Sequence, residues 1–438
     1  MIKQEMIMLK TVLFIMSGFI LVLAQNELSV EDVIQLGLKN NYTIQMARNN
    51  AEIADNNRTL GVSGFLPTLD ASGSYQQSNS SVETNSPFGF GDTDRETMSG
   101  QVQLSWTLFD GFKMFIDRNR YNQLAELGEF QARYAIESAV VAIMRAYFDL
   151  VQQEQLLAVA ESTLDISQIR LDKAKVRNDL GGASSTDFLN ARVSFNNDKA
   201  NYINQQLNVD IARKELNIIL GRDPGESLTV QKKILITPLI LSYDEILELT
   251  NKKNSQLIIA QKNLEVARQN KYNTISPFLP RVSAVGNYSK SDQTDDTESR
   301  GEINSNSQGL SAGLSLSWNL FNGFRNSVDI QNKKLELKNQ KLAMLNEENR
   351  LAGLVKEKYD TFQKRIELVQ LEEENVRAAE QNLKLQQDRF DIGTATSLEF
   401  RDAQLNLALA QNRLITARYQ AQISRLDIDQ LTGDIGIE

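Results

Sequence analysis

The chain has 438 residues, of which 47 are Lys or Arg and 56 are Asp or Glu, giving a formal net charge of −9. It has no Cys and no His, which excludes disulfides, thiolate metal sites, Cys nucleophiles, imidazole catalysis and a Cys-linked lipid anchor. The acidic balance argues against nucleic acid as a partner, because that binding depends on Lys and Arg meeting phosphate. With only six Pro, the chain is expected to form long uninterrupted elements.

The first 24 residues have the pattern of an export signal. Lys3 and Lys10 accompany an apolar run over residues 12–23, and Ala24 supplies a small residue at the expected cleavage position. The run is short for a membrane span, which needs about 20 apolar residues, although an uncleaved anchor helix is the alternative. We expect residues 1–24 to be a cleaved signal peptide and the mature chain to be exported.

The remainder carries one pattern twice. Phe65-Leu66-Pro67 recurs 213 positions later as Phe278-Leu279-Pro280, and residues 106–112 (WTLFDGF) recur 212 positions later as residues 318–324 (WNLFNGF). The protein's two Trp occupy the same place in the two copies. Such constant spacing fits long packed elements, because an insertion in a packed helix would rotate its buried face. We therefore expect two structural repeats of one plan, over residues 25–235 and 236–438.

Each repeat is expected to open with a helix. Ser29 and Ser242 begin capping boxes, and the helices should run to about Ser63 and Ile275, where Pro follows.

Two strands of about 10 to 12 residues follow in each repeat, because apolar and polar residues alternate. The polar face is mostly Ser, Gln, Asn and Thr, which is typical of strands with lipid outside and water inside. Polar loops are expected at about 77–97 and 289–308. A half-buried sheet of a soluble domain is the alternative. The apolar positions are Leu69, Ala71, Gly73, Tyr75, Val102, Leu104, Trp106 and Leu108, then Val282, Ala284, Gly286, Tyr288, Leu310, Ala312, Leu314, Leu316, Trp318 and Leu320.

Trp106 and Phe109, like Trp318 and Phe321, fall at the strand end next to the following helix, where an aromatic membrane-interface girdle would lie. Four strands cannot close a transmembrane barrel, since known single-chain barrels start at eight, and open edges are not tolerated in lipid. Several copies must therefore complete the ring. Two, three or four copies are all compatible with the strand number.

After Gly111 and Gly323 the pattern becomes helical for about 66 residues, or roughly 100 Å. A Gly turn and a returning helical segment follow, and apolar residues recur every seven positions on both arms. This predicts an antiparallel coiled-coil hairpin in each repeat. The heptad positions are Ile143, Leu150, Leu157, Leu164 and Leu171, returning with Phe188, Phe195, Tyr202, Val209 and Leu216, then Val355, Phe362, Val369, Val376 and Leu383, returning with Phe400, Leu407, Leu414, Ala421 and Ile428.

The order of these motifs resembles the TolC-like outer-membrane efflux proteins, over essentially the whole mature chain. The resemblance implies a mainly α fold with transmembrane β-structure: a homotrimer with a 12-stranded outer-membrane β-barrel continuous with a 12-helix periplasmic coiled-coil tunnel. It implies a passive exit duct for efflux or type I secretion, linked by a periplasmic adaptor protein to an inner-membrane pump of the RND, ABC or MFS class.

The resemblance also implies roles for individual residues. Glu399 and Asp402 stand where the family has acidic residues that ring the narrowest point of the tunnel, and Asp187 is a further candidate for this pore constriction. Glu399 and Asp187 also fit capping boxes opened by Thr396 and Ser184, so a cap role is the alternative. The hairpin turns that would meet the adaptor contain Gly181, Gly182, Gly393 and Thr394.

The tunnel closure departs from the family pattern. Phe390 and Ala395 stand where the family has a Tyr and an Arg that hold the tunnel shut, while Thr186 and Asp187 keep the acceptor side. We expect apolar packing by Phe390 and Phe188 to replace those hydrogen bonds.

No enzyme activity, cofactor or metal is expected, because the sequence contains no nucleophile–base set and no phosphate-binding Gly-rich loop. Two other classes remain open, an exported periplasmic adaptor and an exported structural coiled-coil protein. An adaptor would need one hairpin and further barrel-like domains, and a structural coiled coil would not need four alternating strands.

Overall fold

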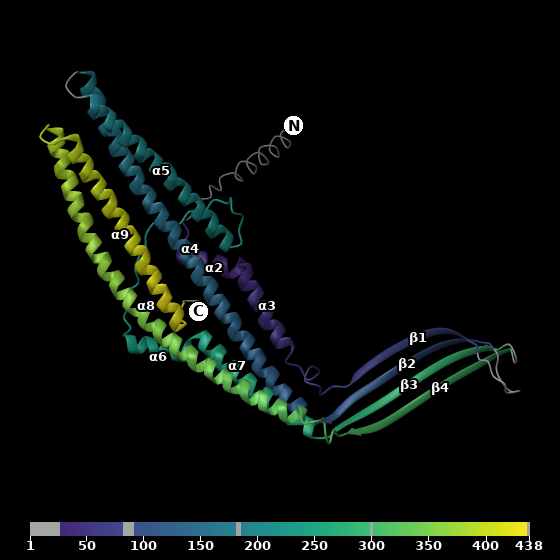
Figure 1. The fold of residues 1–438 in the computed structure, drawn as a ribbon. Helices are drawn as coiled ribbons and strands as arrows, with labels where there is room; N and C mark the ends of the chain where they lie inside the picture. The colour runs from purple at the N-terminus through teal and green to yellow at the C-terminus, as the bar shows by residue number, and fades with distance from the viewer. Residues whose placement is uncertain (1–26, 82–91, 181–184, 298–300, 436–438) are drawn as a thin grey trace, which may run out of the picture. The chain divides into compact units, whose positions relative to one another are not determined.

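The computed structural model describes residues 27–81, 92–180, 185–297 and 301–435 (Figure 1). The segment expected to be a signal peptide therefore lies outside the described residues. The chain divides into two compact units. Unit 1 contains the residues up to Met46 together with Ala135–Asn254 and the residues from Leu351, and unit 2 contains Ala47–Tyr134 and Ser255–Arg350.

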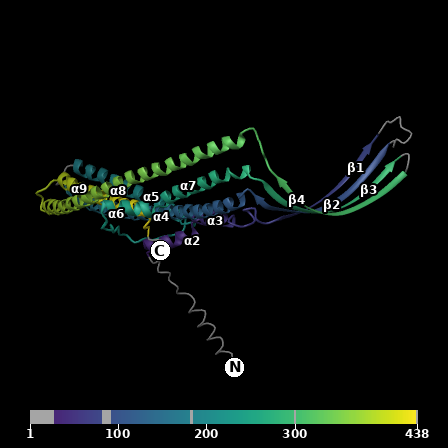
Figure 2. The same ribbon diagram turned by 90° about the horizontal axis from the view of Figure 1, so that it is seen from below.

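Unit 2 contains a four-stranded antiparallel sheet whose spatial order follows the chain order β1-β2-β3-β4 (Figures 1 and 2). The strands β1 and β4 therefore form its two edges. The bounds are Thr68–Ser80 for β1, Thr93–Asp110 for β2, Arg281–Thr297 for β3 and Gly301–Ser317 for β4.

The strands are longer than expected from the sequence. They have 13, 18, 17 and 17 residues rather than 10 to 12, and much of the two segments expected to be loops continues the ladder. Polar side chains pair across the strands there: Asn79 Nδ2 donates to Asp94 Oδ1 at 2.6 Å, and Arg95 Nε donates to Asp295 Oδ1 at 2.7 Å. An antiparallel ladder can extend without an apolar face where such pairs form.

Two helices of 67 residues, α4 (Lys113–Asp179) and α8 (Arg325–Asp391), confirm the predicted long helices. They turn back as α5 (Ser185–Ile219) and α9 (Ser397–Thr432). No helix of the described ranges combines the length and apolar character needed to cross a membrane.

In unit 1 the predicted heptad residues form the contacts between these arms. Ile143 and Leu150 of α4 pack with Val209 and Leu216 of α5 in one apolar cluster. A second cluster joins α8 to α9, through Val369, Val376, Leu414 and Ala421. In Figures 1 and 2, α8 and α9 run side by side over this part of the chain. Each hairpin is thus held by its own apolar seam.

The short helices correct one expectation. The sequence predicted a single helix to about Ser63 and another to about Ile275, but each is two helices broken at an Asn. The bounds are Val30–Asn40 for α2, Tyr42–Asn56 for α3, Tyr243–Lys253 for α6 and Ser255–Asn273 for α7.

Asn41 and Asn254 cause the breaks. Their backbones are extended, with ψ of 124° and 119°, and their side chains take part in hydrogen bonds that a continuous helix would forgo. Asn41 Nδ2 donates to the carbonyl oxygen of Ile219 at 2.6 Å, and Asn254 Nδ2 donates to that of Leu431 at 3.1 Å. Each amide thereby satisfies a carbonyl near the end of a returning helix, α5 or α9.

Candidate functional site

Apolar residues of all four strands lie on one face of the sheet. The register aligns Ala71, Val102, Tyr288 and Leu310 in one row across β1 to β4. These side chains are uncovered: Leu310 and Leu314 are 82% and 76% exposed. We call this surface the apolar sheet face, with Leu69, Ala71, Tyr75, Val102, Leu104, Tyr288, Leu310, Leu314 and Leu316 as members.

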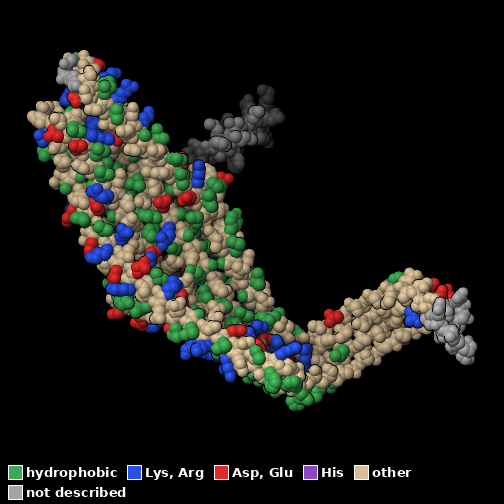
Figure 3. Space-filling model, in the orientation of Figure 1, with side chains coloured by type: hydrophobic (Ala, Val, Ile, Leu, Met, Phe, Trp, Pro, Cys, Tyr) green, Lys and Arg blue, Asp and Glu red, His purple; other side chains and the backbone are tan. Residues whose placement is uncertain are grey.

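The sheet surface seen in Figure 3 shows mostly uncharged polar side chains and backbone, and charged side chains gather toward the far ends of the strands, away from the helices. Large contiguous exposed apolar surfaces mark contacts with lipid or with other chains. The apolar sheet face is therefore the first candidate functional surface of the molecule.

The predicted interface anchors are tied to the loop before each strand pair. Trp106 Nε1 donates to the carbonyl oxygen of Phe65 at 3.0 Å, and Trp318 Nε1 donates to that of Phe278 at the same distance. Both acceptors belong to the repeated Phe-Leu-Pro motif. Sequence reasoning identified the two motifs but not the bond between them, because 41 and 40 residues separate the partners.

Tight turns join the strands to the long helices. Gly111 and Phe112 have φ of 69° and 66°, and Gly323 and Phe324 have φ of 68° and 64°. A non-Gly residue in this left-handed region is uncommon and costs free energy. Edge-to-face ring contacts accompany both turns, at 5.2 Å between Phe109 and Phe112 and at 5.4 Å between Phe321 and Phe324. These contacts offset part of that cost.

The hairpin turn between α8 and α9 is a well-bonded left-handed turn. Gly393 has φ of 80°, and Thr394 donates through its backbone N–H to the carbonyl oxygen of Arg389 at 2.8 Å. Both Gly393 and Thr394 are exposed, as an adaptor contact would require. The corresponding residues of the other hairpin, Gly181 and Gly182, lie outside the described residues.

The candidate constriction residues are exposed in the structure. Glu399 completes a capping box: its Oε2 accepts from the backbone N–H of Thr396 at 2.7 Å, and these hydrogen bonds to Thr396 lower the pKa of Glu399. Asp402 is exposed one turn further along α9, and Asp187 is exposed in the first turn of α5. The capping role of Glu399 is thus real, and its carboxylate stays at the helix surface.

Phe390 is buried, but its neighbours differ from the expected pair. Its ring stacks on Phe400 at 5.3 Å, and Ala395 completes a small apolar cluster. The guanidinium of Arg177 lies 4.7 Å from the ring centroid. Phe188 does not belong to this cluster in the described part of the chain. Thr186 and Phe188 both lie in the first turn of α5.

Lys173 Nζ of α4 lies 2.6 Å from Asp391 Oδ1 of α8, and both side chains are more than two fifths exposed. Contacts of α4 with Phe390 and Asp391 therefore connect the two hairpins close to their turns. The exposure makes the ion pair weak, since solvent screens such pairs.

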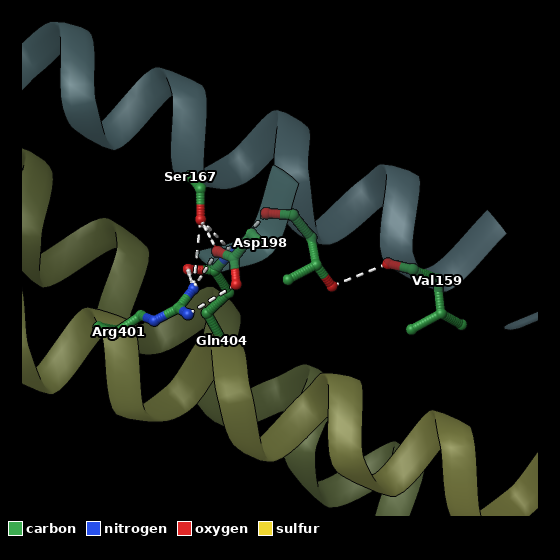
Figure 4. A network of polar contacts seen from close by, with 6 residues as sticks. Val159, Ser167, Asp198, Arg401 and Gln404 are labelled. Atoms are coloured by element: carbon green, nitrogen blue, oxygen red, sulfur yellow. Dashed lines mark hydrogen bonds and ion pairs between the residues drawn. The ribbon is translucent and has the colours of Figure 1, made fainter. Parts of the chain in front are cut away.

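A buried polar layer, which the sequence analysis missed, connects the hairpins further from the turns (Figure 4). Arg401 of α9 forms a two-pronged ion pair with Asp198 of α5, at 2.5 and 2.7 Å. Ser167 of α4 donates to the same carboxylate. Gln404 Nε2 donates to the carbonyl oxygen of Thr163 at 2.7 Å. We call Thr163, Ser167, Asp198, Arg401 and Gln404 the buried polar layer.

One sequence signal could have revealed this layer. Asp198 lies three positions after the heptad residue Phe195, at a place where a coiled coil has a core side chain. A carboxylate there needs a partner because it is only 4% exposed. Arg170 lies nearby, and burial together with the charge of Arg401 lowers its pKa to about 10.

Three comparisons with known proteins agree with this architecture. A family model described as "Outer membrane efflux protein" matches residues 33–222 and again residues 246–434. Outer membrane protein TolC of Salmonella enteritidis is 22% identical over 376 residues, which are 85% of this chain and 75% of TolC. Alkaline protease secretion protein AprF of Pseudomonas aeruginosa is 24% identical over 423 residues, which are 94% of this chain and 86% of AprF.

The fold is also that of solved channels. The CmeC outer membrane channel of Campylobacter jejuni superposes with a TM-score of 0.78 at 15% identity, covering 92% of this chain and 85% of CmeC. The open state of the Neisseria gonorrhoeae MtrE outer membrane channel gives a TM-score of 0.71 at 19% identity, over 92% of this chain and 88% of MtrE. With both repeats matched by the family model, the chain belongs to the outer membrane efflux protein family.

Proposed function

We propose that three copies of this chain form a passive exit duct through the outer membrane, with a 12-stranded β-barrel and a 12-helix periplasmic tunnel. The observation that carries the proposal is the sheet: the described residues of one chain leave its apolar face uncovered, and among them β1 and β4 each have a strand neighbour on one side only. Lipid does not tolerate open strand edges, so neighbouring copies must supply the missing partners.

Three is the number of copies that best fits the family, since four strands from each of three copies give twelve. Residues 1–24 would direct export and be removed, leaving an outer-membrane protein without a lipid anchor. The two structural repeats, 25–235 and 236–438, would then alternate around the ring. The double match of the family model, to 33–222 and 246–434, supports these boundaries.

The duct would act with a periplasmic adaptor and an inner-membrane transporter. The adaptor would bind the hairpin turns, which contain Gly181, Gly182, Gly393 and Thr394. A turn at the free end of a long coiled-coil hairpin is the part that a partner can reach. The names of two relatives, alkaline protease secretion protein AprF and the toluene efflux pump outer membrane protein TtgC of Pseudomonas putida, fit a conduit whose cargo is set by the transporter.

The tunnel would be narrowest at Glu399 and Asp402, with Asp187 as a further acidic group. Three copies would bring six carboxylates of Glu399 and Asp402 together, and a narrow opening lined by one sign of charge favours ions of the other sign. Phe390 would stabilise the closed state from behind this ring, with Thr186 and Phe188 on the facing turn of α5.

Membrane fractionation followed by single-channel recording tests the proposal. We expect the full-length protein in the outer-membrane fraction, detergent-extracted as a trimer, and giving small cation-preferring conductance steps in a planar lipid bilayer. A water-soluble monomer, or a membrane-bound species that never conducts, would overturn the duct and favour the adaptor or the structural coiled coil.

A further inference from the structure

Arg401 of α9 lies in the contact between the hairpins, close to the proposed constriction. Its side chain is 12% exposed, and its two terminal nitrogens bond both oxygens of Asp198. A two-pronged guanidinium–carboxylate pair fixes direction as well as distance, because both hydrogen bonds hold only in one plane.

The buried polar layer extends this constraint to three helices. Nη1 of Arg401 also donates to Ser167 Oγ of α4 and to Gln404 Oε1, both at 3.2 Å. Ser167 and Gln404 are 0% and 2% exposed, so water does not compete for these bonds. Figure 4 shows Arg401 and Gln404 directed from α9 toward Ser167 and Asp198. Together these bonds determine the rotation of α9 about its own axis.

That rotation decides where the constriction carboxylates lie. Successive residues of an α-helix are about 100° apart, so Asp402 lies about 100° from Arg401 and Glu399 about 160° from it. Phe400, Ala403 and Gln404 occupy the buried side of α9 at this level. Glu399 and Asp402 therefore share the exposed side, opposite the groups that hold the helix in place.

We propose that Arg401 is the positioning residue of the constriction: its two hydrogen bonds to the Asp198 carboxylate set the rotation of α9 that presents Glu399 and Asp402 to the lumen. This inference rests on the proposed function of these two carboxylates. It differs from a latch at the hairpin turns, because the Arg401–Asp198 pair is buried, whereas the Lys173–Asp391 pair near the turns is more than two fifths exposed.

Ion selectivity of the purified trimer in planar bilayers tests the assignment. Arg401→Gln should lower the preference for potassium over chloride roughly twofold or more, because the released helix no longer aligns the carboxylates. Asp198→Asn removes the acceptor side and should give the same loss. Arg401→Lys keeps the positive charge but cannot form the two-pronged hydrogen bond. Its potassium preference should lie between those of these variants and of the wild type.

Two controls separate positioning from general damage. Arg413→Gln removes another α9 guanidinium, one that is 54% exposed and paired with Glu372, and should leave selectivity unchanged. The double variant Asp198→Arg/Arg401→Asp reverses the pair and should restore much of the lost preference. The heat stability of the trimer on gels shows whether each variant assembles.

The outcomes also separate this inference from the function on which it rests. If Glu399→Gln/Asp402→Asn abolishes the preference while Arg401→Gln and Asp198→Asn keep it, the constriction stands and Arg401 does not position it. If Glu399→Gln/Asp402→Asn leaves the preference intact, the constriction is elsewhere and the positioning role falls with it. Equal losses from Arg413→Gln and Arg401→Gln would likewise overturn the specific role of the buried polar layer.

Discussion

Cysteines placed at Leu314 and Tyr75 should join neighbouring copies of this chain into a closed, disulfide-linked trimer. The expectation follows from the duplication. Within one chain, β2 of the first repeat pairs with β3 of the second, and Val102 lies opposite Tyr288. The equivalent of Val102 in the second repeat is Leu314, 212 positions later, and the equivalent of Tyr288 in the first repeat is Tyr75, 213 positions earlier. If successive copies pair in the same way, Leu314 of β4 lies opposite Tyr75 of β1 in the next copy.

The geometry of antiparallel strands makes this cross-link feasible. Directly opposed residues have Cα atoms about 4.5 to 5.5 Å apart, which lies within the range that a disulfide spans. The link cannot form within one chain, because two strands separate β1 from β4 and adjacent strands are about 4.8 Å apart. The absence of native Cys leaves no competing thiol.

Oxidation of the Leu314→Cys/Tyr75→Cys variant in membranes should produce dimers and trimers, and nothing larger, on non-reducing gels. The matched control is Leu314→Cys/Ala71→Cys, which keeps the same two strands and the same face but shifts one thiol by four residues, or about 13 Å. Cross-linking of the control instead would place β4 and β1 in another register. A ladder that continues beyond three would contradict a closed ring of three copies.

The elements that sequence analysis predicted well are those specified by local periodicity. The heptads around Ile143 and Val369 predicted the long helices to within a residue or two of length, because each turn of a helix repeats the same requirement for an apolar side chain. The alternation around Val102 likewise predicted the apolar sheet face. These features depend on neighbours within one turn or one strand.

The features that were missed depend on distant partners. The break at Asn41 becomes favourable through the carbonyl oxygen of Ile219, 178 residues away. The ladder near Arg95 extends because Asp295, 200 residues away, faces it. The Arg401–Asp198 pair joins positions 203 residues apart. Sequence spacing gives no measure of such proximity, so the constriction residues could be proposed but the group that orients them could not.

Replacing Gly323 by Ala should damage the assembled protein as severely as replacing Gly111, although one chain alone gives them unequal surroundings. A Cβ at Gly111 would lie 2.5 Å from the carbonyl oxygen of Ser276 and 2.9 Å from Leu279 Cβ, whereas none of the described atoms lies within 4 Å of a Cβ at Gly323. The left-handed backbone, with φ near 69° and 68°, costs an Ala about 1–2 kcal/mol at both positions.

A closed ring of three copies would remove the inequality. Ser63 and Leu66 of the neighbouring copy are the repeat equivalents of Ser276 and Leu279, so they would pack on Gly323 as those residues pack on Gly111. Each substitution should then add a steric cost to the backbone cost, for about 3 kcal/mol or more. The measurement is the midpoint temperature at which the detergent-solubilised trimer dissociates.

Gly301→Ala supplies the matched control, because Gly301 has φ of 70° and its Cβ would meet none of the described atoms within 4 Å. It lies at the start of β4, far along the strand from the turn at Gly323, so with respect to the described residues only the backbone cost applies. We expect Gly111→Ala and Gly323→Ala to lower the midpoint by similar amounts, and Gly301→Ala by clearly less. If Gly323→Ala behaves like Gly301→Ala, no neighbouring loop packs on that turn. The strands β4 and β1 of successive copies are then not joined as β2 and β3 are within one.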